Sequence, residues 1–179
     1  MICIRKITDE DFGLKSIPFV NPRCRLGARG IVFNNENKIA ILHKNLKNEY
    51  KLVGGGIDEN EDPTIAFKRE CLEEAGCKVE IDDCLGTVEE LKTLDDFKQT
   101  SYIYIAHVLE DLGHTYFTEQ EKGEGSELLW LNIDDAMNVI KGSEDKLIAS
   151  KFDSDKSVYH TKFIVRRDYE ILKYYKNHS

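Results

Sequence analysis

The sequence has little proline and no long run of apolar residues. Only three prolines occur in 179 residues, and no repeat or Pro/Ser-rich linker divides the chain. No stretch approaches the roughly 18 consecutive apolar residues that a membrane span requires. The first residues, MICIRKITDEDFG, contain charge early and no apolar segment typical of a secretory signal. We therefore expect one domain over 1–179, with short N- and C-terminal extensions, in the cytoplasm and without a membrane partner.

Paired cysteines are also absent. The five cysteines form no CxxC pair and no spacing typical of zinc; they are Cys3, Cys24, Cys71, Cys77 and Cys84. An odd number of cysteines in a chain without a secretory signal indicates reduced thiols in the cytoplasm. We expect most of them to serve as small buried side chains.

Positive charge is in deficit. The net charge is −8 at pH 7, and no block of five or more basic residues occurs. Proteins that bind nucleic acids usually carry a basic patch, so this balance argues against a nucleic-acid polymer as a partner. A small phosphorylated ligand remains compatible with the composition, because bound metal ions can supply positive charge locally.

The order of expected elements indicates a mixed α/β domain in which helices cover a sheet. Strands are expected at 26–33, 38–43, 50–53, 77–81, 85–91, 101–109 and 128–131. A helix is expected between Asp62-Pro63, an N-cap followed by a first-turn proline, and Gly76. A second helix should run from the N-cap Asn132 to about Ile140, and a third over 161–175, with a loop over 141–160.

The first of these helices carries the clearest chemical pattern. Residues 54–77 are GGGIDENEDPTIAFKRECLEEAGC. On a helix, Glu70, Glu73 and Glu74 fall within about 100° of arc. Crowded carboxylates repel one another and raise each other's pKa, and a bound divalent cation removes that penalty. Mg²⁺ prefers oxygen ligands, so the helix suits a magnesium site.

The loop before the helix fits the same role. Its three glycines, 54–56, lack Cβ atoms, so their backbone can approach a metal or a phosphate closely. The loop leads into a helix N-terminus, which favours negative charge. Arg69 and Glu61 can pair bidentately and fix the orientation of neighbouring carboxylates.

The sequence RExxEE alone is more often a solvated helix face than a catalytic motif. Here, however, the whole loop and helix are in register: Gly55, five residues, Glu61, seven residues, Arg69-Glu70, Glu73-Glu74 and Gly76. This string resembles the Nudix box, G-x5-E-x7-R-E-U-x-E-E-x-G-U, where U is bulky and aliphatic. Cys71 and Cys77 depart from it at the two U positions, and Val53 stands where relatives often carry proline.

The resemblance implies an α/β/α sandwich with a mixed sheet and hydrolysis of a diphosphate linkage with Mg²⁺ or Mn²⁺. Carried over by position, Glu70, Glu73 and Glu74 would bind the metal, with the carbonyl of Gly55 as a further ligand. Glu70 and Arg69 would belong to the catalytic centre. Arg69 and Glu61 would orient the carboxylates.

Relatives often place a general-base glutamate in a loop before a late strand. The corresponding segment here is 118–129, and its candidates are Glu119, Glu121 and Glu124. We prefer Glu124, because it lies between two glycines in a loop that can fold over the metal site. Glu89 and Glu90, at the end of a strand, are the alternative.

The substrate is less well defined. A nucleoside triphosphate, including an oxidised deoxynucleotide, ranks first, with cleavage to the monophosphate and pyrophosphate. An ADP-ribose or nucleotide-sugar pyrophosphatase, a non-catalytic nucleotide sensor and an RNA-cap hydrolase are the alternatives, and a homodimer is left open. Candidates for base stacking are Phe33, Tyr50, Phe97, Tyr102 and Tyr104. Arg166 and Arg167 could touch a phosphate, although salt bridges at the end of a helix are the default role.

Overall fold

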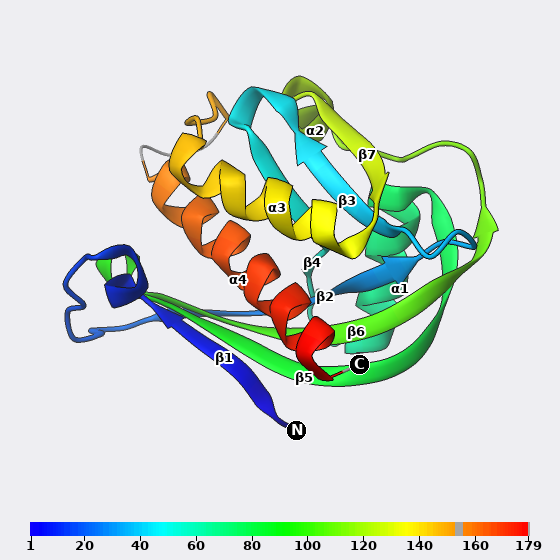
Figure 1. Ribbon diagram of the computed structural model, residues 1–179. Coiled ribbons are helices and arrows are strands. Elements are labelled where there is room, and N and C mark those ends of the chain that lie inside the picture. Colours follow the sequence, from blue (N-terminus) through cyan, green and yellow to red (C-terminus); the bar gives the residue numbers. More distant parts are fainter. Residues whose placement is uncertain (153–155, 179) are drawn as a thin grey trace.

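A computed structural model describes residues 1–152 and 156–178 of the chain. Its centre is a mixed seven-stranded sheet with the order β1-β5-β6-β2-β4-β3-β7. The pairs β1–β5 and β2–β6 are parallel, and the remaining neighbours are antiparallel. The mixed α/β class expected from the sequence is confirmed (Figure 1).

The elements have the following bounds. The strands are β1 (Cys3–Thr8), β2 (Arg23–Phe33), β3 (Ile39–Lys44), β4 (Glu49–Gly56), β5 (Cys77–Lys92), β6 (Phe97–Asp111) and β7 (Ser126–Leu131). The helices are α1 (Pro63–Ala75), α2 (Glu119–Gly123), α3 (Ile133–Ser143) and α4 (Ser157–His178). Short 3-10 turns lie at Asp9–Phe12, Asn45–Lys47, Thr93–Asp95 and Glu144–Lys146.

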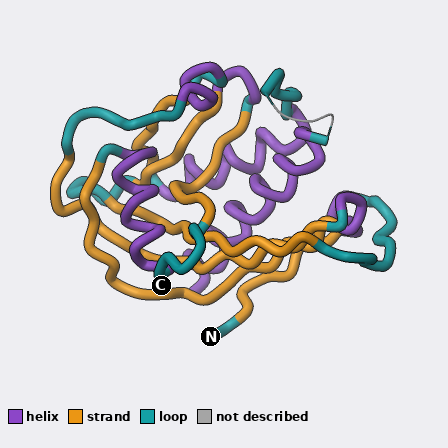
Figure 2. Tube along the Cα trace, turned by 180° about the vertical axis from the view of Figure 1, so that it is seen from behind, coloured by secondary structure: helices purple, strands orange, loops and turns teal. Residues whose placement is uncertain are grey.

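Helices cover both faces of the sheet. On one face, Phe67 and Cys71 of α1 pack into a core with alternate residues of the central strands. On the other face, α3 and α4 bury Ile140 and Phe163 in a second core. Figures 1 and 2 show these layers from opposite sides. Burial of apolar area on both faces stabilises the sandwich and fixes α1 and α4 on opposite sides of the strands.

Three long strands extend beyond the sandwich. Strands β2, β5 and β6 form a ribbon that carries the turn Asp9–Phe12 near its far end (Figure 2). The register between β5 and β6 shifts at three places, at 78/79, 81/83 and 84/86. Such bulges bend a strand without ending it.

Several element boundaries differ from the sequence-based expectations. Strand β5 is continuous where two strands, 77–81 and 85–91, were expected, because its bulges accommodate the polar residues between them. Strand β1 was not expected, since only its neighbour β5 provides the pairing that holds it. The loop expected over 141–160 contains the end of α3 and the start of α4, although residues 153–155 of that segment lie outside the described residues.

Candidate functional site

Helix α1 is fixed at both ends by local interactions. The carboxylate of Asp62 accepts a hydrogen bond from the Thr64 amide at 2.8 Å, and Pro63 occupies the first turn. Gly76 ends the helix in the left-handed region with φ 63°. A Cβ at Gly76 would lie 2.0 Å from the carbonyl oxygen of His114. Both expected ends are therefore confirmed, and the acidic face of α1 has a fixed orientation.

Arg69 joins the glycine loop to the helix. Its guanidinium donates to both carboxylate oxygens of Glu61 at 3.0 Å each. It also donates to the carbonyl oxygen of Gly56 at 3.0 Å and to Glu70 at 2.8 Å. Bidentate pairs of this kind fix planar groups relative to one another. Arg69 and Glu61 thus have the contacts that an orienting pair requires.

Glu70 lies directly on the backbone of Gly55. A Cβ added at Gly55 would lie 2.3 Å from Oε1 of Glu70, which is closer than real contacts allow. The absence of a side chain at this position is therefore what gives the carboxylate its place. The structure thus brings together two residues that the sequence motif named.

Glu74 is buried beneath the same loop. It accepts hydrogen bonds from Lys51 Nζ at 2.7 Å and from the amide of Gly54 at 2.8 Å. Burial raises the pKa of Glu74 above its ordinary value, an effect that Lys51 opposes and Glu70 supports. The sequence predicted a raised pKa from like-charge repulsion, but desolvation is the larger cause. Lys51 was not foreseen as the partner of this carboxylate.

The oxygen donors of α1 fit a hard divalent cation in chemical type. Glu70 and Glu74 converge on Gly54 and Gly55, while the side chain of Glu73 is 44% exposed and lies 3.4 Å from Arg69. Among the described residues, no group of three or more acidic, histidine or cysteine side chains is already arranged to hold a metal ion. Lys51 and Arg69 instead provide the positive charge that balances these carboxylates.

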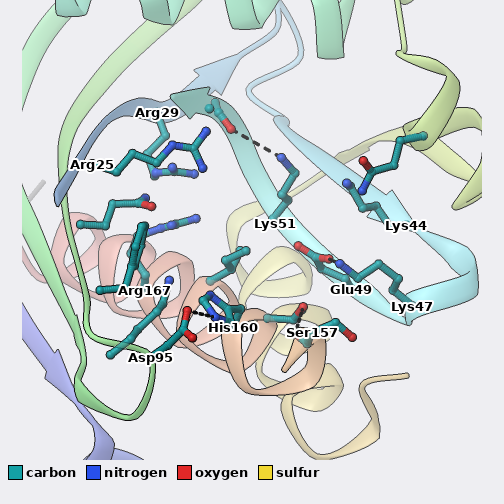
Figure 3. A pocket seen from close by; sticks show the side chains of 18 of the residues that line it. Arg25, Arg29, Lys44, Lys47, Glu49, Lys51, Asp95, Ser157, His160 and Arg167 are labelled. Atoms are coloured by element: carbon teal, nitrogen blue, oxygen red, sulfur yellow. Dashed lines mark hydrogen bonds and ion pairs between the residues drawn. The ribbon is translucent and has the colours of Figure 1, made fainter. Parts of the chain in front are cut away.

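A cavity of about 450 Å³ adjoins the glycine loop and extends to α4. Two acidic residues, Glu49 and Asp95, contribute to its wall. Its basic residues are far more numerous: Arg23, Arg25, Arg29, Lys44, Lys47, Lys51, Lys92 and Arg167. Figure 3 shows Arg25, Arg29 and Arg167 on one side of the cavity, and Lys44, Lys47 and Lys51 on the other. A chain of net charge −8 thus concentrates positive charge in one hollow.

The sequence analysis did not identify these basic residues as a site, because they are distant from one another along the chain. One signal was nevertheless present. Arg23, Arg25 and Arg29 share the odd-numbered positions of β2, and alternate residues of a strand point to the same face. Three arginines on one face of a strand were therefore a sequence pattern that could have indicated a basic site.

The candidates for the general base lie outside this cavity. Glu124 is 1% exposed and accepts hydrogen bonds from Lys44 at 2.7 Å and Ser150 at 2.8 Å. Burial alone would raise the pKa of Glu124, but these hydrogen bonds hold it below its ordinary value. Glu119 is exposed and pairs with Lys122, and Glu121 caps the start of α2.

The alternative base candidates are also paired. Glu89 forms an ion pair with Lys6 at 2.9 Å, near the edge of the sheet. Glu90 is fully buried between Lys92 and Arg167, at 3.0 and 2.9 Å. Its pairing makes Glu90 a partner of two cations that line the cavity.

Among the aromatic residues considered for base stacking, only Phe97 lines the cavity. Phe33 contacts Tyr175, Tyr50 stacks on His43, and Tyr104 stacks on Phe67. The two adjacent arginines of α4 separate in role. Arg166 pairs with Glu144, the default role for such a residue, whereas Arg167 reaches the cavity.

The expectation that most of the five cysteines are buried is wrong, because Cys3 and Cys24 are exposed and Cys84 is only partly buried. Cys71 and Cys77 are the two that serve as packing residues. Both are buried in the core beneath α1. Burial raises the pKa of the Cys77 thiol to about 11 and that of Cys71 well above its ordinary value. Small side chains at the two departures from the motif are thus compatible with a closed core.

A family model for the NUDIX domain matches residues 24–151, which contain the glycine loop, α1 and most of the cavity. The chain belongs to the NUDIX family. The resemblance inferred from the motif is therefore confirmed. NUDIX hydrolases generally use a divalent cation such as Mg²⁺. Among helices of the described residues, none is long and apolar enough to cross a membrane.

The NUDIX relatives of known sequence include diphosphoinositol polyphosphate phosphohydrolases. The chain is 31% identical to phosphohydrolase 2 of Rattus norvegicus over 114 residues, which cover 62% of this chain and 60% of the relative. It is 33% identical to phosphohydrolase 3-beta of Bos taurus over 88 residues, 49% of this chain and 50% of the relative. The match thus spans between half and three fifths of the length of these relatives.

Solved structures support the NUDIX fold. A MutT protein from Methanosarcina mazei Go1 matches with a TM-score of 0.53 at 17% identity, covering 89% of this chain and 99% of that one. A UDP-X diphosphatase matches with a TM-score of 0.52 at 18% identity, covering 91% and 67%. The α/β/α sandwich expected from the resemblance is confirmed.

Proposed function

We propose that this NUDIX protein hydrolyses a diphosphate linkage in a small molecule that carries several phosphate groups. The observation that supports this most directly is the cavity, in which eight basic residues face two acidic ones beside Gly54 and Gly55. A concave site with an excess of one charge concentrates ligands of the opposite charge. The positive charge is supplied by the protein itself, which the net charge of the chain conceals.

In this proposal the residues of α1 bind the part of the substrate that contains the scissile diphosphate. Glu70, Glu73 and Glu74, with the carbonyl of Gly55, would hold the divalent cation. A bound Mg²⁺ or Mn²⁺ lowers the pKa of a water molecule and neutralises charge on the phosphoryl oxygens. Arg69 keeps Glu70 in place through its contacts with Glu61 and the glycine loop.

Glu124 remains the proposed general base. Its ionised carboxylate can accept a proton, and its segment joins α2 to β7 beside the cavity residue Lys44. For this role Lys44 and Ser150 must release the carboxylate when the substrate is bound. Catalytic hydrogen bonds often form fully only in the complex, so the pairing of the free protein is compatible with the proposal.

The excess of cations favours a densely phosphorylated ring compound as the substrate. The NUDIX relatives named above act, by name, on diphosphoinositol polyphosphates. Such a substrate has many phosphates and no base, which matches a wall rich in arginine and lysine and poor in aromatic rings. Each ordered phosphate would be held by charge-assisted hydrogen bonds.

A nucleoside triphosphate is the second candidate, and Phe97 is the observation in its favour. Its ring lines the cavity, with the guanidinium of Arg23 at 5.2 Å from the ring centroid. A base could stack on this ring and replace the arginine. The triphosphate would then extend toward the glycine loop.

A hydrolysis panel with Mg²⁺ separates these proposals. It should contain a diphosphoinositol pentakisphosphate, the common and oxidised nucleoside triphosphates, ADP-ribose and a nucleotide sugar, with products identified by chromatography. We expect release of orthophosphate from the inositol compound at the highest kcat/KM. Release of pyrophosphate from a nucleotide at a higher kcat/KM would favour the second candidate. Absence of turnover on every member, with ligand binding retained, would indicate a sensor.

A further inference from the structure

The wall of the cavity nearest α4 contains a cluster of buried charges. Arg29, Lys92 and Arg167 are 4%, 3% and 1% exposed, and Glu90 and Asp168 are fully buried. All three cations line the cavity, whereas neither carboxylate does. The two carboxylates therefore lie behind the cations, and the cations form part of the surface of the cavity.

Arg167 uses only part of its hydrogen-bonding capacity. Its Nε donates to Asp168 at 2.7 Å and its Nη1 to Glu90 at 2.9 Å. Its Nη2 is buried and has no hydrogen-bond partner among the described residues. An unsatisfied buried donor on a charged group is costly, so this nitrogen requires an acceptor such as an ordered water or a ligand oxygen.

Arg29 has still less compensation. Its Nε donates to Ser101 Oγ at 3.2 Å, and no carboxylate of the described residues lies within ion-pair distance of it. Burial and the neighbouring charge of Arg167 lower the pKa of Arg29 to about 10. The protein thus keeps two guanidinium groups close together at an electrostatic cost.

The buried cluster contains more cations than carboxylates. Three buried cations stand against two buried carboxylates, so the cluster carries an excess positive charge next to an open cavity. Asp168 is further engaged by the amide of Leu52 at 2.9 Å. A ligand with negative oxygens would satisfy both the free Nη2 and the excess charge. Phosphate matches the planar donors of arginine in this way.

We propose that Arg29 and Arg167 form a phosphate subsite that binds a group of the substrate that is not cleaved. The inference rests on the proposed function. Arg29 pairs with Gly54 across β2 and β4, so the subsite adjoins the glycine loop on the side of α4. Its contribution is therefore to select substrates with a second phosphate next to the scissile diphosphate.

The first experiment measures binding without catalysis. Isothermal titration calorimetry in EDTA should use inositol hexakisphosphate, inorganic tripolyphosphate and ATP as separate probes. We expect Arg29→Met and Arg167→Met to weaken binding of inositol hexakisphosphate by about tenfold or more. The matched control is Arg166→Met, because Arg166 is the neighbouring arginine of α4 and pairs with Glu144 outside the cavity. It should change binding less than about twofold.

Stability distinguishes a binding role from a structural one. Arg29→Met removes repulsion from Arg167 and breaks no ion pair, so the free protein should unfold at the same temperature or a higher one. Arg167→Met leaves Glu90 and Asp168 with less compensation and should unfold earlier. If Arg167→Met does not fold, Arg29→Met alone decides the question.

Kinetics complete the test. Loss of a contact to an uncleaved group should raise KM and leave kcat within a few-fold for Arg29→Met. Wild-type binding by Arg29→Met, or a loss no larger than that of Arg166→Met, would overturn the subsite. If no diphosphate compound is hydrolysed but anion binding still depends on Arg29, the proposed function fails and the subsite stands.

Discussion

The acidic face of α1 and the basic wall of the cavity differ in how they tolerate concentrated charge. Glu70 and Glu74 each have a cationic partner within 2.8 Å, supplied by Arg69 and Lys51. On the cavity wall, Arg29 has no such partner among the described residues, and one nitrogen of Arg167 is unsatisfied. The negative charge of the first region is compensated in the free protein, whereas the positive charge of the second is compensated only in part.

Under the proposed function, this difference would give the two regions different parts in catalysis. Carboxylates that already have partners can exchange those partners for a metal without a large change in net charge. A guanidinium without an ion pair, such as that of Arg29, gains most from a ligand that brings its own negative charge. Chemistry at α1 and recognition at the cavity wall should therefore respond differently to mutation.

The largest expected effect is the loss of turnover in Glu70→Gln. The variant keeps the shape of the side chain but removes a proposed metal ligand, and the bound cation provides several kcal/mol of transition-state stabilisation. We expect kcat to fall by about 10⁴-fold while the unfolding temperature changes little. Steady-state assays over a range of Mg²⁺ concentrations measure this, with the exposed Glu110→Gln as the control. A near wild-type rate with unchanged magnesium dependence would show that Glu70 is no ligand.

Glu124→Gln tests the proposed base. The amide cannot accept a proton at neutral pH, so the rate should fall by about 10²–10⁴-fold and the acidic limb of the pH–rate profile should disappear. Glu119→Gln should be mild, because Glu119 is exposed and pairs with the exposed Lys122. A small change in rate together with a lower unfolding temperature would instead assign Glu124 to anchoring Lys44.

Glu74→Gln should differ from Glu70→Gln in stability. Repulsion between the carboxylates of α1 suggests that neutralising either one leaves the free protein unchanged or slightly more stable. Lys51 changes that expectation for Glu74, because its buried ammonium would lose its only acidic hydrogen-bond partner among the described residues. We expect a loss of about 3 kcal/mol in the free energy of unfolding, measured by urea titration. Equal stability of the two variants would contradict the role of Lys51.

Glu90→Gln tests how much the buried carboxylate behind Lys92 and Arg167 contributes to stability. Burial would raise the pKa of Glu90, but Lys92 and Arg167 hold it at about 2, below the ordinary 4.5. A lowered pKa means that the stabilisation is present above pH 4.5 and is lost as the pH falls toward 2. We expect the free energy of unfolding of the wild type to exceed that of Glu90→Gln by about 3 kcal/mol at pH 7. In urea titrations at lower pH, this difference should shrink below pH 4.5. A difference that stays constant down to pH 2.5 would contradict the assignment.

Three glycine substitutions should produce sharply separated effects, and the one at Gly142 should be the smallest of all. Gly54 has φ 139° and an added Cβ would lie 2.3 Å from that of Arg29, so Gly54→Ala should cost about 3 kcal/mol of stability. Gly55→Ala should mainly reduce kcat, because the added Cβ would displace the carboxylate of Glu70. Gly142→Ala meets no atom within 4 Å in α3 and should stabilise by about 0.5 kcal/mol. Calorimetry and activity assays on the three together separate packing from chemistry.

The two regions also differ in how far the sequence predicts them. The site on α1 could be predicted because its parts lie within residues 55–76 and each depends on local rules, such as the cap at Asp62 and the turn at Gly76. The cavity could not, because Arg29 and Arg167 meet only after β2 and α4 have packed. Pairing partners were hidden for the same reason: Lys51 and Glu74 are 23 residues apart. Even adjacent residues can have different surroundings: Arg166 pairs with Glu144, whereas Arg167 lines the cavity.

Strand β2 has a consequence for how this protein tolerates insertions and deletions. Ala28 and Val32 belong to the core beneath α1, whereas Arg29 lines the cavity and Ile31 packs in the core beneath α4. Because side chains alternate, inserting or deleting one residue within this strand would exchange its two faces. The guanidinium of Arg29 would then enter an apolar core. Length changes should therefore be confined to the turns at either end, while point substitutions inside the strand can retune recognition one position at a time.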